Sequence, residues 1–379
     1  MMFAIGIVLF IYCLCMLWLL IGFDKVSTFN FSNTILKTPF TVIIPFRNEA
    51  KNLPLLLDSI KKLNYPKEYV EFIFVDDDSS DNSVRIIEDS FKKTDLNSVL
   101  PTIHIIKNKR VSNSPKKDAI QTAIELATHE WIITTDADCM LPKNWLNSYN
   151  IFIQQNTAVM IAGPVKYQIN HTLLEKFQLA EFHTLQAATI GSFGIKKPMM
   201  CNGANLAYTK TAFYAVNGFE GNNTIASGDD VFLFEKMHQQ YTNEVHFLKS
   251  VEALVTTFPA KSWKGFIEQR IRWASKATNY QLIHTKFVGV LVFLMNLVIV
   301  ISSFLFLFGK LSLLVFIISF TIKILIDSFL LQKFNFFFEK EKRIKIDVVN
   351  GIVYPFLSVF IVLLTICTGY TWKGRHFKK

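Results

Sequence analysis

Apolar residues concentrate at the two ends of the chain. Residues 1–23 carry no charge, and three later stretches, 287–309, 311–331 and 348–370, are almost as apolar. A helix of about 20 apolar residues crosses a bilayer, so each stretch is long enough to span one. Residues 1–23 lack the basic start and small-residue cleavage site of a signal peptide, which favours an uncleaved anchor. The pattern predicts an integral membrane protein.

Between these ends the pattern changes to alternating strands and helices. Strand-like runs occur at 40–45, 69–75, 102–106, 131–135 and 158–162, and helical spacing at 49–63, 83–91 and 116–127. Such alternation predicts an α/β fold with a mainly parallel, doubly wound sheet, whose ligands bind beyond the carboxyl ends of the strands. We therefore expect an anchor at 1–23, a linker at 24–39, a folded domain at 40–276 and a membrane region at 277–379.

Two acidic clusters follow predicted strands. Asp76, Asp77 and Asp78 come directly after one strand, and Asp136 and Asp138 after another. Carboxyl ends of parallel strands meet at one sheet edge, so we expect the clusters to lie together. Like charges this close require compensating partners, and carboxylate oxygens suit a hard divalent cation that also binds phosphates. The alternative is an acidic turn before each helix.

The charge balance refines the picture. The chain has 40 Lys plus Arg against 30 Asp plus Glu, a net charge of +10, with much of the excess in 332–347 and after Tyr370. Basic residues beside apolar stretches suit anionic lipid headgroups, so we expect no nucleic-acid partner. Five cysteines without disulfide or zinc spacing indicate a cytosolic domain. Three full C-terminal crossings cannot leave both basic segments in the cytosol, so one segment is expected to be re-entrant or interfacial.

Six motifs carry a resemblance to a known family. VIIPFRNE (42–49), VDDDSSD (75–81), PKKDAI (115–120), TDADC (135–139), GDD (228–230) and QRIRW (269–273) occur in the order seen in family 2 glycosyltransferases, which this chain resembles. The resemblance implies a GT-A fold and transfer of a sugar, with inversion, from a nucleotide-sugar donor. UDP is the nucleotide expected at family level.

The resemblance also implies roles for residues of the donor site. Asp138 and Asp136 match the metal-binding DXD motif, with Mg²⁺ or Mn²⁺ as the cofactor. The positions that match the nucleotide-sugar pocket are Pro45, Arg47, Glu49, Asp76, Asp77, Lys116 and Asp136. Asp77 would accept a hydrogen bond from the base, while Asp78 stands where the family commonly has Gly.

Further roles concern catalysis and the acceptor. Asp230 matches the family's catalytic base and Asp229 its preceding Glu; the alternative is a pair that caps a helix. The residues expected on the acceptor or diphosphate side are Asn202, Gly203, Gln269, Arg272 and Trp273. For Arg272 and Trp273 the alternative is ordinary anchoring at the membrane surface.

We therefore expect a glycosyltransferase that acts on a lipid or lipid-linked acceptor. It would lie in the bacterial inner membrane with its catalytic domain in the cytosol, with membrane partner subunits as a further possibility. A short processive polysaccharide synthase and an inactive glycosyltransferase-like scaffold are the alternatives.

Overall fold

The computed structural model describes residues 2–29, 35, 37–92, 101–222, 225, 227–341, 343, 346–372 and 375–377. Part of the expected linker and the basic residues Lys342, Lys345, Lys373, Lys378 and Lys379 lie outside this description. The chain forms two compact units. The sheet unit comprises Thr28–Gln168 and Met200–Phe258, and the membrane unit comprises Met1–Ser27, Ile169–Met199 and Pro259–Lys379.

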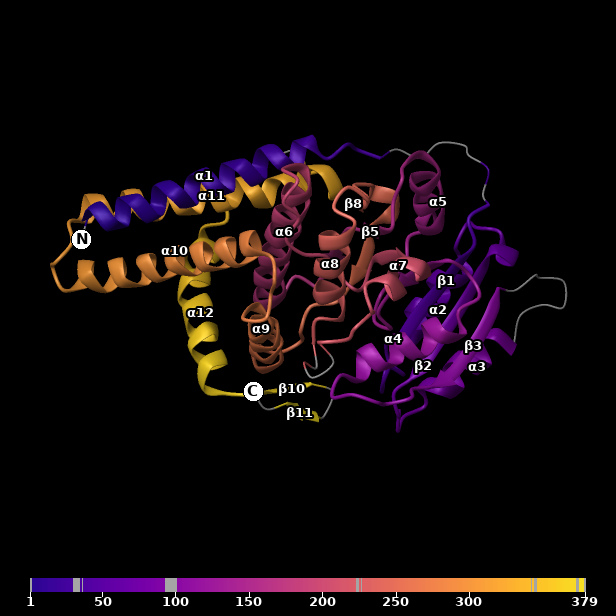
Figure 1. The fold of residues 1–379 in the computed structure, drawn as a ribbon. Helices are drawn as coiled ribbons and strands as arrows, with labels where there is room; N and C mark the ends of the chain where they lie inside the picture. Colours follow the sequence, from indigo (N-terminus) through magenta and orange to yellow (C-terminus); the bar gives the residue numbers. More distant parts are fainter. Residues whose placement is uncertain are drawn as a thin grey trace. The chain divides into compact units, whose positions relative to one another are not determined.

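A seven-stranded sheet forms the centre of the sheet unit (Figure 1). Its order is β3 (Thr102–Lys107), β2 (Val70–Asp76), β1 (Phe40–Phe46), β4 (Trp131–Thr134), β7 (Leu206–Thr209), β5 (Met160–Ala162) and β8 (Val245–Phe247). β7 runs antiparallel to both neighbours and the other pairs are parallel. This confirms the predicted mainly parallel α/β sheet.

Helices and a small second sheet complete the sheet unit. The helices are α2 (Leu53–Lys61), α3 (Ser83–Lys92), α4 (Pro115–Leu126), α5 (Trp145–Gln155), α7 (Lys210–Ala215) and α8 (Asp229–Gln240). Single 3-10 turns lie at η1 (Lys67–Tyr69) and η2 (Val251–Ala253), and β6 (Val165–Tyr167) pairs with β9 (Val255–Thr257). The helix predicted at 49–63 begins only at Leu53, because the amides of Asn52 and Leu53 both donate to the Glu49 carbonyl in a preceding turn.

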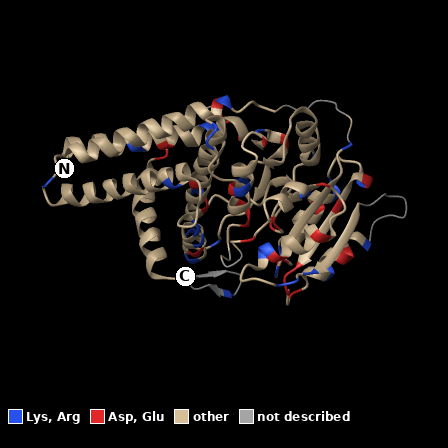
Figure 2. Ribbon diagram, in the orientation of Figure 1, with Lys and Arg blue, Asp and Glu red and all other residues tan. Residues whose placement is uncertain are grey.

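The membrane unit is helical apart from one hairpin. Its elements are α1 (Met2–Lys25), α6 (Leu173–Gly194), α9 (Trp263–Ala277), α10 (Ile283–Leu307), α11 (Leu313–Phe338), α12 (Val348–Cys367), β10 (Tyr370–Trp372) and β11 (Arg375–Phe377). α1, α10, α11 and α12 are long and apolar enough to cross a membrane. Figure 2 shows α10 and α12 almost without charged residues, whereas charges are scattered along the strands and helices of the sheet unit. One N-terminal and three C-terminal candidate membrane helices are thus confirmed.

Small and polar residues hold the membrane helices together. The backbones of α1 and α6 approach so closely at Gly22 and Gly191 that a Cβ on either glycine would overlap the other helix. Asp327 on α11 accepts hydrogen bonds of 2.5 Å from Lys323 Nζ and from the Tyr12 hydroxyl of α1. Lys323 and Asp327 therefore pair inside the bundle, as intramembrane charges generally must.

Candidate active site

The two acidic clusters meet at one edge of the sheet. β1 lies between β2 and β4, and all three run parallel, with Phe46 opposite Asp76 and Ile43 opposite Thr134. Residues that follow these strands therefore emerge at the same edge. This arrangement brings together Arg47, Asp77 and Asp136, as the pattern of strands predicts.

Asp77 is buried and held from two directions. Its Oδ1 accepts hydrogen bonds from Arg110 Nε at 2.7 Å and from Asn108 Nδ2 at 2.8 Å, and its side chain is 9% exposed. Its backbone carbonyl accepts one from Arg47 Nη1 at 2.8 Å. The sequence reasoning missed Arg110 and Asn108. They follow β3 just as Asp77 follows β2, so their place after the neighbouring strand is the signal that could have identified them.

The backbone of the turn after β2 explains why Asp78 can stand where the family commonly has Gly. Asp78 has φ +65° and Asn48, opposite it after β1, has φ +53°. This left-handed region favours Gly, and Asp and Asn are among the residues that tolerate it best. Asp78 thus keeps the turn that Gly would form. Asp76 supports it by accepting the Ser79 amide at 2.9 Å.

The start of the α2 segment is tied to this turn. Asp81 accepts the Ala50 amide at 3.0 Å and the Ser83 hydroxyl at 2.5 Å. Glu49 is buried, donates its amide to Ser83 Oγ at 2.9 Å and accepts from Asn52 Nδ2 at 2.6 Å. Pro45 is the partly buried strand residue opposite Val75.

Lys116 joins two of the predicted motifs. Its ammonium lies 2.7 Å from Asp136 Oδ1 and 3.2 Å from Asp229 Oδ2. Burial alone would lower the pKa of Lys116, but the charges of Asp136 and Asp229 outweigh it and raise this pKa above the ordinary lysine value. Lys116 is therefore a permanent cation between the DXD motif and the start of α8.

The adjacent Lys117 has a different function. It is 1% exposed and donates to the carbonyls of Asn222 at 2.6 Å and Ile225 at 2.8 Å, with its ammonium 5.1 Å from the Phe232 ring centroid. Lys117 thus holds the backbone at Asn222 and Ile225.

Asp230 and Gly203 are in direct contact. Asp230 Oδ2 accepts the Gly203 amide at 3.1 Å. A Cβ on Gly203 would lie 3.2 Å from Asp229 Oδ2 and 3.3 Å from Asp230 Cβ, so only Gly fits here without displacing a neighbour. Gly228 caps α8 with φ +87°, a conformation that favours Gly. Asn202 closes the same loop by accepting the Ala204 amide on its side chain at 3.0 Å.

The two DXD carboxylates are suitable ligands for a divalent cation, but two side chains do not complete its coordination. Asp136 and Asp138 are hard oxygen donors that favour Mg²⁺ or Mn²⁺. Burial and both carboxylates raise the pKa of the Cys139 thiol well above its ordinary value, so it is neutral and a poor ligand. No group of three His, Cys, Asp or Glu residues that could hold a metal occurs in the described part of the chain. Donor phosphates and water would have to complete the coordination.

The residues of the QRIRW motif lie on α9 in the membrane unit. Arg270 is 5% exposed and its guanidinium binds Glu181 with contacts of 2.7–3.0 Å. It also donates to Gln269 Oε1 at 2.6 Å and lies 4.2 Å from the Trp273 ring centroid. Arg272 is partly buried, and its carbonyl accepts the Ser275 hydroxyl at 2.9 Å. The roles predicted for Gln269, Arg272 and Trp273 toward the acceptor or diphosphate stay predictions.

Comparison with known families and proteins gives consistent matches. The model of "Glycosyl transferase family 2" matches residues 41–215, and that of "Glycosyl transferase family group 2" matches residues 131–368. An undecaprenyl-phosphate 4-deoxy-4-formamido-L-arabinose transferase of Proteus mirabilis is 36% identical over 117 residues, which cover 31% of this chain and 32% of that protein. A poly-beta-1,6-N-acetyl-D-glucosamine synthase of Staphylococcus epidermidis is 24% identical over 230 residues, covering 60% of this chain and 52% of that protein.

One solved structure shows the same fold along almost the whole chain. A mannosyltransferase from Pyrobaculum calidifontis, in complex with GDP-Man and Mn²⁺, has a TM-score of 0.59 at 16% identity. The match covers 94% of this chain and 97% of that one. By contrast, the chain spans only about a third to a half of the two curated relatives' lengths.

Proposed function

The chain belongs to glycosyl transferase family group 2 and is a glycosyltransferase, and we propose that it moves a sugar, with inversion, from a UDP-sugar to a lipid or lipid-linked acceptor. The observation that carries the proposal is the bridge formed by Lys116. It connects Asp136 of the DXD motif with Asp229, beside the catalytic-base candidate Asp230. Donor-side and acceptor-side carboxylates thus belong to one cluster within the sheet unit.

On the donor side, the nucleotide base would lie against Asp77. A buried carboxylate held by Arg110 and Asn108 is a fixed acceptor for a base N–H. Asp136 and Asp138 would hold Mg²⁺ or Mn²⁺, which would stabilise the negative charge that develops on the departing diphosphate. Lys116 is close enough to Asp136 to contribute positive charge to the same diphosphate.

On the acceptor side, Asp230 would accept the proton of the attacking hydroxyl. Inversion requires this base on the face of the sugar opposite the leaving group. The Gly203 amide holds Asp230 Oδ2, and the absence of a side chain at Gly203 lets an acceptor group approach the carboxylate.

The membrane unit supports a lipid acceptor. Four apolar helices associate the chain with a membrane, and the similar Proteus mirabilis protein is an undecaprenyl-phosphate transferase. We place the protein in a bacterial inner membrane with the sheet unit in the cytosol. The similarity to a poly-beta-1,6-N-acetyl-D-glucosamine synthase supports a second candidate, a short processive synthase. Retention of Asp136, Asp138 and Asp230 argues against an inactive scaffold, which has no chemical need for them.

The test is transfer of labelled sugar from UDP-, GDP- and dTDP-sugars into the lipid fraction of membranes that contain the chain. Product from one donor should disappear with EDTA, in Asp138→Ala and in Asp230→Asn. It should persist in Asp58→Asn, which removes a carboxylate that is 60% exposed and paired only with Lys62 in the described contacts. A single added sugar supports the proposal, and a ladder of products supports the synthase. Transfer that survives Asp230→Asn would refute the assignment of the base.

A further inference from the structure

A pocket of about 390 Å³ lies inside the membrane unit. Its walls come from α1, from the segment that follows α6, and from the first turns of α10. The residues on α1 run from Ile11 to Leu19, so the pocket extends about 12 Å along that helix at 1.5 Å per residue. Its volume falls in the range of pockets that enclose small molecules.

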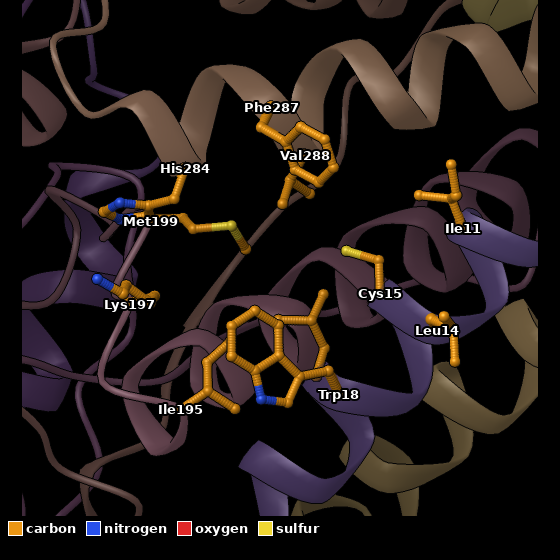
Figure 3. A pocket seen from close by; sticks show the side chains of 11 residues that line it. Ile11, Leu14, Cys15, Trp18, Ile195, Lys197, Met199, His284, Phe287 and Val288 are labelled. Carbon is orange, nitrogen blue, oxygen red and sulfur yellow. The ribbon is translucent and has the colours of Figure 1, made fainter. Parts of the chain in front are cut away.

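The two ends of this pocket differ in chemistry. Figure 3 shows Lys197, Met199 and His284 at one end, and Ile11, Leu14 and Cys15 at the other. None of the described residues that line the pocket is acidic. An apolar chamber with basic groups at one end is complementary to a molecule with a hydrocarbon chain and an anionic head.

The basic end is rigidly built. The Lys197 amide donates to the Ser192 carbonyl at 2.9 Å and the Met199 amide to Ser192 Oγ at 3.1 Å, which fixes the segment on α6. His284 Nε2 lies 2.8 Å from the Pro198 carbonyl oxygen, so this nitrogen carries a proton and ties the segment to α10. The backbone that carries Lys197 and the ring of His284 are therefore positioned before any ligand binds.

The start of α10 adds to the positive potential at this end. His284 is in the first turn of a 25-residue helix that has no acidic residue in that turn and whose N-cap residue, Leu282, is apolar. The amide ends of a helix dipole attract anions, and phosphate is a common ligand there. Lys197, His284 and the helix start thus favour the same kind of group.

We propose that this pocket holds the hydrocarbon chain of a lipid-linked acceptor between α1 and α10, with the phosphate that joins the lipid to its glycan beside Lys197 and His284. The identification of the lipid as acceptor rests on the proposed function. The lipid-binding site rests on the pocket itself, so the two parts can fail separately.

The test is equilibrium binding of radiolabelled geranylgeranyl phosphate to the purified full chain in phosphatidylcholine nanodiscs. Lys197→Glu should weaken binding about tenfold or more, because it replaces a charge-assisted contact with repulsion. Lys196→Glu is the matched control, since Lys196 is adjacent and exposed but does not line the pocket. It should weaken binding much less than Lys197→Glu, because its exposed side chain makes no contact with the pocket and its charge is screened by solvent.

A second pair of variants tests the apolar end. Leu14→Trp fills the pocket and should weaken binding, whereas Leu17→Trp should not. The two leucines are 51% and 45% exposed, but only Leu14 lines the pocket. Geranylgeraniol and inorganic phosphate should each compete poorly, because each offers only half of the ligand. Equal losses in Lys197→Glu and Lys196→Glu, or full displacement by inorganic phosphate, would overturn the site.

Transfer assays separate the two parts of the proposal. An active chain should show a raised KM for the lipid acceptor in Lys197→Glu with an unchanged KM for the donor. If Lys197→Glu transferred sugar with an unchanged KM for the acceptor, the assignment of the pocket to the acceptor would be refuted and the proposed function would stand. Variant-sensitive binding by a chain that transfers no sugar would overturn the proposed function and leave the lipid site. Equal displacement by phosphatidic acid would overturn the acceptor assignment.

Discussion

Removal of the Lys116 ammonium should disable the site while leaving most of the fold intact. Lys116→Met keeps the aliphatic chain but removes both contacts, 2.7 Å to Asp136 and 3.2 Å to Asp229. Hydrogen bonds between charged groups contribute about 1.5–3 kcal/mol each. The Asp136 side chain is 36% exposed, so water can replace part of the hydrogen bond that it loses with the Lys116 ammonium. The Asp229 side chain is only 12% exposed, so water replaces little of its lost contact. We therefore estimate a net loss of about 2–3 kcal/mol after this discount.

If the whole loss adds to the activation free energy of transfer, the rate should fall about 30- to 150-fold, at 1.36 kcal/mol per factor of ten. The assay is the initial rate of sugar transfer at saturating donor, over a range of Mn²⁺ concentrations. Removing a cation beside Asp136 should also lower the Mn²⁺ concentration that gives half-maximal activity, because less repulsion opposes the metal. A variant that is only destabilised would not show tighter metal binding together with a slower rate.

The control is a surface ion pair of similar length. Lys62 lies 2.6 Å from Asp58, but the two side chains are 68% and 60% exposed. Exposed pairs contribute about 0–1 kcal/mol, so Lys62→Met should change neither the rate nor the Mn²⁺ dependence. If Lys116→Met matched Lys62→Met in both measurements, burial and the double contact would not matter, and the role of the bridge would be refuted.

Three further changes test other parts of the structure. Gly203→Ala should lower kcat about tenfold with little change in melting temperature, because the added Cβ would lie 3.2 Å from Asp229 Oδ2. An unchanged kcat would show that the loop can move to accommodate the Cβ and would contradict this expectation. Arg270→Met should lower the free energy of unfolding by about 3–5 kcal/mol, because Glu181 loses its buried partner. The melting temperature of the detergent-solubilised chain would show this loss. Adding Glu181→Leu should restore most of the lost stability. Asp327→Leu should lower the melting temperature more than Asp327→Asn, which can still hydrogen-bond Tyr12.

The first half of the fold could be predicted because its strands are buried on both faces. β1, β2 and β4 are mostly apolar, with Thr41 and Glu71 among the buried polar exceptions, and no predicted bound differs by more than one residue from that observed. After Ala162 the strands contain only three or four residues and some of them pair antiparallel, so neither length nor alternation separates them from loops. α6 was missed because its buried face includes Gln178, His183 and Gln186, which interrupt the apolar spacing.

The candidate site was predictable where a residue follows a strand or belongs to a motif. Asp77, Asp136 and Asp230 could be identified in this way. The contacts between these residues could not be predicted, since Arg110 reaches Asp77 from the next strand and Lys116, itself identified from its motif, reaches Asp229 across more than a hundred residues of chain. Such contacts depend on how the sheet orders its strands, and that order is not contained in any local pattern.

The sequence leaves two explanations open for the QRIRW motif, a role toward the acceptor or diphosphate and anchoring at the membrane surface. A residue that only anchors a helix at the membrane surface needs an amphipathic side chain and no fixed partner. Here the Arg270 guanidinium lies between the rings of Phe266 and Trp273, at 4.4 and 4.2 Å from their centroids, while it binds Glu181. This network fixes the Trp273 ring and the Gln269 amide at the cost of burying an ion pair, which surface anchoring does not require. The network holds Gln269 and Trp273 in fixed positions on α9, which is the support that their predicted role toward the acceptor or diphosphate would need; that role stays a prediction.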